Sequence, residues 1–223
     1  MQGIVVSGFF RKMFGGGPGS QGTVQEQSHE RISRRSTGFQ EFIRAITTPE
    51  GQRILDLGPT SPANLSFITE LGHRAYNEDI LLESHDPGFL LPSENGNPKQ
   101  IDVERFLAEN LNHEKAVFDA VLLWDVPDYL DEALVKPVVE RIHKITKPGG
   151  LLLGFFHTRD AGPEAPYYRY HIADRQTLEL QRGPQFHLKR VFNNRHIENL
   201  FRDYASIKFF LGRDNIREVL VVR

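Results

Sequence analysis

Several polar residues follow short apolar runs that the sequence predicts to be β-strands. Asp56 and Gly58 end one such run, and Glu78 and Asp79 end the next. In an open α/β sheet, ligands bind beyond the carboxyl ends of the strands, where the strand order reverses. A carboxylate in that position can accept two hydroxyl protons at once. The sequence therefore indicates four places for a ligand site: Asp56 to Asn64, Glu78–Asp79, Asp102, and Trp124 to Tyr129.

A histidine, His157, ends the apolar run 151–157 and is placed to act as a general base toward an oxygen nucleophile. A histidine that ends a strand is also commonly a hydrogen-bonded structural residue, so both interpretations stay open. His171 and Asp174 lie three residues apart without an identifiable third ligand, and none of the nine histidines forms an H-x-x-x-H pair. The sequence predicts no metal site.

Three tyrosines and an arginine group together in the segment 163–170, which reads PEAPYYRY. Tyr167 and Tyr168 could form aromatic walls around a small planar or amphipathic ligand. Packing of the same two rings against the edge of a sheet is an equal alternative.

The elements that must position these residues alternate between strands and helices. The run Phe118–Trp124 is almost continuously apolar, as is typical of a strand buried in a parallel sheet. Ser61 followed by Pro62 predicts a helix start, and Gly72 predicts its end. This alternation favours a parallel sheet covered on both faces, with an antiparallel pair at the end. The expected strands are 53–57, 73–78, 118–124, 151–157, 206–211 and 216–222, and the expected helices are 38–46, 61–71, 103–111, 131–146 and 193–204.

Two regions of different composition divide the chain. Residues 15–36 are rich in Gly, Ser and Gln and lack apolar periodicity, which indicates a flexible connector. We therefore predict a flexible leader over residues 1–37 and one domain over residues 38–223. That domain is large enough to bury a stable core without disulfides.

Composition excludes several classes of function. The chain of 223 residues has 27 Lys and Arg against 29 Asp and Glu, so its net charge is −2 and argues against a nucleic-acid partner. It has no cysteine, which excludes thiol chemistry and cysteine metal sites. No apolar stretch approaches the roughly 20 residues of a membrane-spanning helix. We expect a cytoplasmic protein, and the sequence leaves its oligomeric state open.

Four motifs carry a resemblance to a known family. The segments ILDLGPTSPAN (54–64), GHRAYNEDI (72–80), FDAVLLWDVPDYL (118–130) and KPGGLLLGFFH (147–157) follow one another in the family's order and spacing. Together with the ending from His196, they resemble the class I S-adenosylmethionine-dependent methyltransferases over residues 39–223. The resemblance implies a Rossmann-like, doubly wound, mostly parallel seven-stranded sheet with a C-terminal antiparallel strand.

The resemblance also implies roles for matching residues at the cofactor. Asp56 and Gly58 would hold the methionine end of S-adenosylmethionine. Asp79, with Glu78 as the near alternative, would bind the ribose hydroxyls.

Further matches concern the adenine and the methyl acceptor. Asp102 and Val103 would contact the adenine. The turn that begins at Trp124 would lie beside the methyl group, with Trp124 against the cofactor and Asp125 against the substrate. The loop that contains Tyr167 and Tyr168 would cover the acceptor.

The turn 58–64, which follows the first expected strand and is called the cofactor turn below, departs from the family pattern. Only Gly58 is kept, while Thr60 and Ala63 stand where glycine would let the backbone approach the cofactor. Pro59 and Pro62 have no N–H to donate. Hydrogen-bond donors and acceptors on the side chains could substitute, from Thr60, Ser61 and Asn64.

Two functional hypotheses follow from the motifs. The first is an S-adenosylmethionine-dependent methyltransferase with a small-molecule acceptor. The second is a catalytically inactive methyltransferase-like binding module with a degenerate cofactor site. A nicotinamide-dependent enzyme is a weaker third, because the turn lacks the G-x-G-x-x-G pattern.

Overall fold

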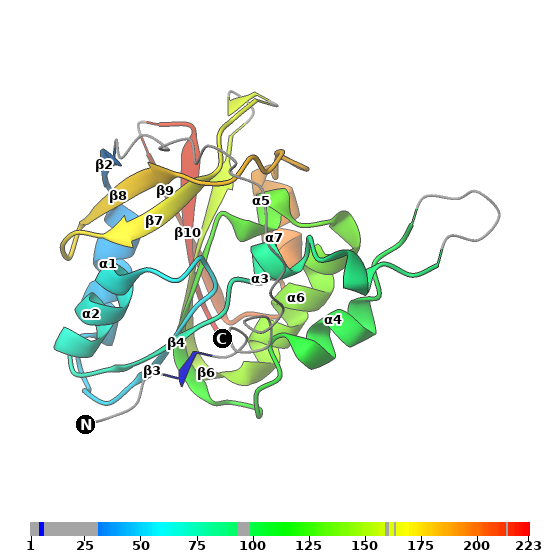
Figure 1. Ribbon diagram of the computed structural model, residues 1–223. Helices are drawn as coiled ribbons and strands as arrows, with labels where there is room; N and C mark the ends of the chain where they lie inside the picture. The colour runs from blue at the N-terminus through cyan, green and yellow to red at the C-terminus, as the bar shows by residue number, and fades with distance from the viewer. Residues whose placement is uncertain (1–4, 7–30, 93–98, 159–160, 163, 213) are drawn as a thin grey trace, which may run out of the picture.

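A seven-stranded sheet forms the centre of the molecule (Figure 1). The computed structural model describes residues 5–6, 31–92, 99–158, 161–162, 164–212 and 214–223. The strand order is β1-β4-β3-β5-β6-β10-β9. Strand β10 runs in the opposite direction to the other six. This confirms the Rossmann-like α/β fold with a C-terminal antiparallel strand. The strands are β1 (Val5–Val6), β3 (Arg53–Asp56), β4 (Arg74–Asn77), β5 (Phe118–Trp124), β6 (Thr146–His157), β9 (Ser206–Leu211) and β10 (Ile216–Val222).

Helices cover both faces of this sheet (Figure 1). Helices α1 and α2 pack on one face with Phe39, Ile43 and Ile68 in the core, whereas α4, α6 and α7 cover the other. Ser61 caps α2 with Pro62 in its first turn, and Gly72 follows with φ of +82°, as predicted. The helices are α1 (Thr37–Ile46), α2 (Pro62–Glu70), α3 (Ile80–Glu83), α4 (Val103–Glu109), α5 (Val126–Tyr129), α6 (Glu132–Ile145) and α7 (Asn194–Leu200), with a 3₁₀ turn η1 (Pro87–Phe89).

A second sheet of three antiparallel strands lies over α2 and the end of β5, and the sequence did not predict it. Its order is β2-β8-β7, formed by β2 (Arg31–Arg35), β8 (Thr177–Arg182) and β7 (Tyr168–Ile172). Alternate side chains, among them Leu178 and Leu180, join the core on the α1 and α2 side. Because this sheet has one buried face, its strands alternate in polarity and lack the long apolar run that marks β5.

Strand β2 moves the start of regular structure toward the N-terminus. Residues 31–35 were predicted to belong to the leader, but they pair with β8 along their whole length. Their composition is polar because most of the strand is exposed, with Arg34 as the buried exception. The flexibility predicted for residues 7–30 concerns a part of the chain outside the described residues.

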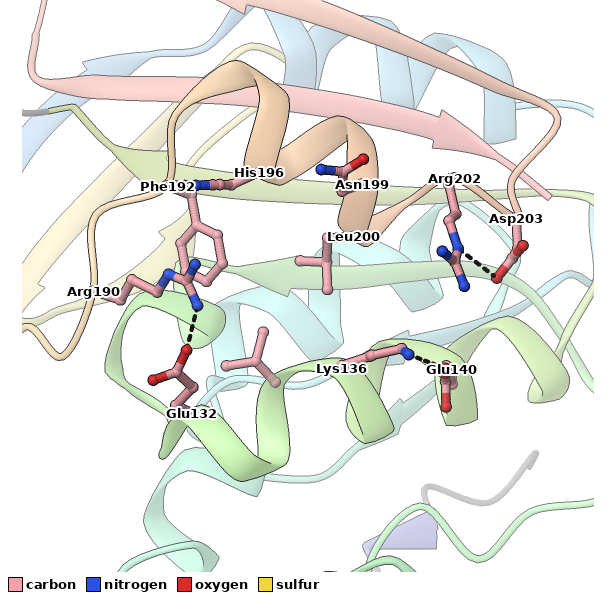
Figure 2. A pocket seen from close by; sticks show the side chains of 11 residues that line it. Glu132, Lys136, Glu140, Arg190, Phe192, His196, Asn199, Leu200, Arg202 and Asp203 are labelled. Atoms are coloured by element: carbon pink, nitrogen blue, oxygen red, sulfur yellow. Dashed lines mark hydrogen bonds and ion pairs between the residues drawn. The ribbon is translucent and has the colours of Figure 1, made fainter.

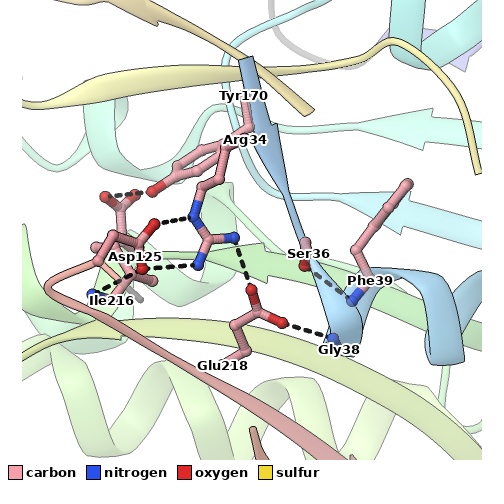
Figure 3. Close-up of polar contacts among 9 residues, drawn as sticks. Arg34, Ser36, Gly38, Phe39, Asp125, Tyr170, Ile216 and Glu218 are labelled. Carbon is pink, nitrogen blue, oxygen red and sulfur yellow. Dashed lines mark hydrogen bonds and ion pairs between the residues drawn. The ribbon is translucent and has the colours of Figure 1, made fainter. Parts of the chain in front are cut away.

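Arg34 ties β2 to the central sheet (Figure 3). Its guanidinium forms ion pairs of 2.7 Å with Glu218 on β10 and 2.6 Å with Asp214. The other carboxylate oxygen of Glu218 accepts a hydrogen bond of 2.5 Å from the Gly38 backbone N–H, in the first turn of α1. Both Arg34 and Glu218 are buried, so the pair links β2, α1 and β10 in the interior.

The edge of the central sheet next to β4 is formed by Val5 and Val6, a strand of two residues. Asp102 was nominated as a ligand position because it was expected to lie near a short strand. In the structure, Ile101 forms only an isolated bridge with Leu90 and takes no part in this sheet. Among the described residues, no helix is long and apolar enough to cross a membrane.

Candidate functional site

The four parallel strands β4, β3, β5 and β6 point in the same direction, so their carboxyl ends lie side by side along one end of the central sheet. Their ends bring together the regions of Asp56, Asp79, Trp124 and His157, which the sequence had nominated separately. This edge, with the β2-β8-β7 sheet above it, is the candidate site.

Asp56 is buried at the centre of this edge, with 1% of its surface exposed. One carboxylate oxygen accepts hydrogen bonds from the Trp124 indole N–H at 2.6 Å and the Gly58 backbone N–H at 3.0 Å. The other accepts one from the Asn64 side chain at 2.8 Å. Burial raises the pKa of Asp56, and the three hydrogen bonds oppose that shift. The carboxylate therefore has its main acceptor positions filled by the protein itself.

Asn64 connects the cofactor turn to the second sheet. Its amide N–H donates to the Tyr170 carbonyl at 3.1 Å, and its carbonyl accepts from the Ile172 N–H at 2.8 Å. The sequence suggested that Asn64 replaces a missing glycine contact with a ligand. In the structure its amide bonds Asp56 and the backbone of β7.

Thr60 contacts a residue that the sequence analysis did not select. Its hydroxyl donates to the Asn77 side chain at 2.5 Å. The amide of Asn77 donates in turn to the carbonyls of Asp56 and Gly58 at 3.1 and 2.8 Å. The polar Asn77 at the end of the otherwise apolar face of β4 was a signal that could have identified it.

Ser61 and His171 form a second polar connection between the turn and β7. The Ser61 hydroxyl lies 2.8 Å from Nδ1 of His171, and Nε2 of His171 lies 3.0 Å from the Gln181 side-chain oxygen. Because that oxygen can only accept, Nε2 carries the proton and Nδ1 accepts from Ser61. Burial lowers the pKa of His171 and so favours this neutral form.

Trp124 covers the cofactor turn. A Cβ on Gly58 would lie 2.9 Å from Cδ1 of the indole, so the ring packs directly on the turn and only glycine fits there. The indole also stacks on Tyr170, at 5.1 Å between centroids with an interplanar angle of 2°, and contacts the rings of Phe39 and Phe155. Trp124 has φ of +53°, a left-handed conformation that is uncommon for a large side chain.

These contacts test whether the site fits S-adenosylmethionine as the resemblance implies. The methionine end would need an acceptor at Asp56 and space beside Gly58. Trp124 takes both, and the Gly58 N–H and the Asn64 amide fill two more of the about four acceptor positions of this carboxylate. The methionine end of the cofactor does not fit this arrangement, so no chemical step is derived through the cofactor here.

The acidic pair after β4 divides into two environments. Glu78 accepts hydrogen bonds from the Leu111 N–H at 2.8 Å and lies 2.5 Å from Nε2 of His113. Asp79 caps α3 through the Leu82 N–H at 3.1 Å and is only partly buried. Burial raises the pKa of Asp79. Arg169 lowers the pKa of Asp79, and the carboxylates of Glu83 and Asp56 raise it, so these charges lie within electrostatic range of Asp79.

Asp102 and Val103 lie at the start of α4. Asp102 caps this helix through the Arg105 N–H at 3.0 Å, and Val103 packs against the core. Ile101, which precedes this pair, forms an isolated bridge with Leu90 and does not extend the central sheet. The pair therefore does not follow a strand of that sheet.

A buried acidic cluster follows Trp124. Asp125 accepts a hydrogen bond of 3.1 Å from the Tyr170 hydroxyl. Asp128, one turn further along α5, accepts from the His157 backbone N–H at 2.6 Å and lies 2.8 Å from Nδ1 of the same histidine. Each carboxylate keeps one buried oxygen, Oδ1, without a hydrogen-bond partner among the described residues.

Burial controls the protonation of this cluster. It raises the pKa of Asp125 to about 7 and that of Asp128 to about 6, partly opposed by His157. For His157, burial alone would lower the pKa, but the hydrogen bond to Asp128 and the charges of both carboxylates raise it. The spacing Asp-x-x-Asp after an apolar strand was the signal that could have identified Asp128.

The two tyrosines proposed as acceptor walls have different surroundings. Tyr167 is 3% exposed and packs edge-on against Tyr129 and Phe186, at 5.1 Å in each case. Tyr168 is half-buried at the start of β7. The ring that reaches the candidate site is that of Tyr170, which the sequence analysis did not select.

A groove of about 330 Å³ lies between α6 and α7 (Figure 2). Ion pairs line it, including Arg190 with Glu132 at 2.7 Å. It contains none of the candidate residues. Among the described residues, no three His, Asp or Glu side chains gather closely enough to hold a metal ion.

Comparisons with known proteins identify the family. A model for a methyltransferase domain matches residues 27–204. No curated protein matches the sequence.

Solved structures show a similar fold at low identity. A methyltransferase from Methanosarcina mazei is 15% identical to this chain. The matched region spans 81% of this chain and 96% of the other, with a TM-score of 0.48. One from Mesorhizobium loti is 15% identical over 84% and 98%, with a TM-score of 0.48. The 1,6-didemethyltoxoflavin-N1-methyltransferase of Burkholderia thailandensis is 14% identical over 84% and 77%, with a TM-score of 0.46. Because the family model covers well over half of the sequence, this chain belongs to the methyltransferase domain family.

Proposed function

We propose that this protein is an S-adenosylmethionine-dependent methyltransferase with a small-molecule acceptor. The observation that carries the proposal is the family match over residues 27–204. The sheet supports it, since Asp56 and Asp79 follow neighbouring parallel strands at the edge where ligands bind in this class of fold. The net charge of −2 favours a small acceptor over nucleic acid.

In this proposal Asp79 binds the cofactor ribose and Asp125 faces the acceptor together with Tyr170. Asp79 is the acidic residue at the strand ends that is both partly open and close to Asp56. Asp125 is joined to Tyr170 by a hydrogen bond, and Asp128 with His157 lies beside it. His157 is the candidate base, and Asp128 fixes its ring orientation through Nδ1.

Calorimetric titration with S-adenosylmethionine and S-adenosylhomocysteine tests this function. We expect the wild type to bind both ligands and Asp79→Asn to bind them about tenfold more weakly, because a charge-assisted hydrogen bond becomes a neutral one. Asparagine also caps helices, so α3 should be retained. Absence of binding to the wild type at millimolar ligand would contradict the proposal, whereas normal binding to Asp79→Asn would contradict only the ribose assignment.

A second function, a non-catalytic binding module, is favoured by one observation. The acceptor positions of Asp56 are filled by Trp124, Gly58 and Asn64. A protein that has lost the cofactor would fold normally and bind neither cofactor form. The same titration therefore separates the two functions.

A further inference from the structure

We infer that Trp124 is an internal ligand of the cofactor subsite, and that the cofactor must displace its indole from Asp56 and Tyr170 in order to bind. This inference rests on the proposed function and explains why the methionine end does not fit the closed arrangement. It assigns to Tyr170 the role of the aromatic surface on which the indole and the cofactor compete.

The indole reproduces two features of the ligand that the site would take. Its N–H donates to the Asp56 carboxylate at 2.6 Å, as the ammonium group of a bound methionine moiety would. Its ring lies flat on Tyr170, with 2° between the planes. An aromatic face also attracts a cationic group such as a sulfonium, so the same surface suits both occupants.

The backbone of Trp124 is compatible with a residue that changes position. Its φ of +53° is costly for a side chain with a Cβ, and such conformations persist only where surrounding contacts hold them. Here those contacts are the hydrogen bond to Asp56, the packing against Gly58 and Tyr170, and the rings of Phe39 and Phe155. A cofactor that replaces them would also release the strained backbone.

The movement that opens the site is limited to one side chain and its neighbours. Asn64 keeps its bonds to the Tyr170 carbonyl and the Ile172 N–H, which hold β7 against the turn. Asp125 accepts from the Tyr170 hydroxyl and so holds the ring in place. The surface beneath the indole is therefore preorganised, and displacement of Trp124 uncovers an acidic group beside an aromatic face.

Fluorescence of the wild-type protein tests the displacement directly, because Trp124 is the only tryptophan in the chain. At saturating S-adenosylmethionine, we expect the emission maximum to move to longer wavelength as the indole leaves its buried place. Adenosine is the matched control ligand. It lacks the methionine end, and we expect it to leave the emission unchanged.

Trp124→Phe tests the energetic part of the inference by calorimetry. Phenylalanine keeps a ring on Tyr170 but has no N–H for Asp56, so the cofactor no longer has to break that bond. We expect S-adenosylmethionine to bind this variant about tenfold more tightly than the wild type. Phe42→Leu is the control, since Phe42 is an equally buried ring of the same core that makes no bond to Asp56. It should bind with wild-type affinity.

Each result has a defined meaning. If the wild type binds S-adenosylmethionine and the emission does not change, or if Trp124→Phe binds no more tightly than the wild type, the internal-ligand role is wrong and the proposed function stands. If neither protein binds, the proposed function fails and this inference fails with it. A shift together with tighter binding by Trp124→Phe supports both.

Discussion

At the scale of single residues, the unusual feature is a pair of buried carboxyl groups in one short helix. Asp125 and Asp128 each have one oxygen with no hydrogen-bond partner among the described residues, and both lie near His157. An ionised carboxylate without such partners is costly to bury. Burial raises the pKa of Asp125 to about 7 and that of Asp128 to about 6, so folding shifts both groups toward their protonated forms relative to the unfolded chain.

This cluster makes stability depend on pH in a defined direction. In the unfolded chain the pKa of Asp125 lies near the ordinary value of an aspartate, 3.8. Between that pH and about 7, the folded state binds more protons than the unfolded state, so the free energy of unfolding falls as the pH rises. Asp128 acts in the same direction, as does His157 with its raised pKa.

We predict that Asp125→Asn is more stable than the wild type at pH 8, by about 1–4 kcal/mol, because each pKa unit corresponds to about 1.4 kcal/mol. The difference should shrink as the pH falls from about 7 and vanish below about pH 3, where Asp125 is neutral in both states. Urea unfolding at several pH values measures it. Asp131→Asn, which changes an exposed helix cap to an equally good one, should follow the wild-type profile. A difference that stays constant with pH would contradict the prediction.

At the scale of elements, strand β2 depends on one buried ion pair. Arg34 carries the bonds from β2 to Glu218 and Asp214, and its guanidinium lies 5.2 Å from the centre of the Phe155 ring. Removal of one partner from such a pair leaves a buried charge without compensation. The position of β2 therefore depends on Arg34 as well as on the pairing with β8.

We predict that Arg34→Met lowers the free energy of unfolding by about 3–5 kcal/mol, since Glu218 then remains charged and unpaired. The double variant Arg34→Met/Glu218→Gln should recover much of this loss, because glutamine is neutral and its oxygen can still accept from the Gly38 N–H. Denaturant unfolding of the two variants and the wild type gives the comparison. Equal loss in the single and double variants would show that the charge of Glu218 is not the cause.

At the scale of the whole molecule, the two hydrophobic core clusters lie on opposite faces of the central sheet. They differ in the elements that cover them. The cluster beneath α4, α6 and α7 is covered by these helices and by loop residues such as Tyr167 and Phe192. The cluster beneath α1 and α2 is completed by strands β7 and β8, which in turn pair with β2. An N-terminal segment thus completes the face that carries the candidate site.

Two truncated chains test how much β2 contributes. A chain that begins at residue 31 keeps β2 and should lose only about 1 kcal/mol, because the lost strand β1 has two residues. A chain that begins at Ser36 keeps the cap of α1 but lacks Arg34 and β2, and we expect it to lose at least about 3 kcal/mol. Urea unfolding measures both, with near-ultraviolet circular dichroism of Trp124 as the local signal. If the two truncated chains unfold at the same urea concentration, the stabilising role of β2 is wrong.

Local features of the sequence were enough to place most elements of the central sheet. The apolar run Phe118–Trp124 is β5 to the residue, because a strand buried on both faces has few polar positions. The Ser61–Pro62 start and the Gly72 end of α2 were also predicted correctly, since capping depends on neighbouring residues alone.

What the tertiary structure decided concerns residues that meet only after folding. Strand β2 pairs with the distant β7–β8 hairpin, and none of the three strands has a long apolar run, so neither periodicity nor spacing identified their sheet. The same holds for Trp124, whose bond to Asp56 joins residues 68 positions apart. The sequence by itself determined the family, the parallel sheet and the strand ends at which a ligand would bind. Only the packing of β7 and Trp124 onto the turn 58–64 decided that this site is closed, because the buried Asp56 accepts hydrogen bonds there from the side chains of Trp124 and Asn64 and from the Gly58 backbone N–H.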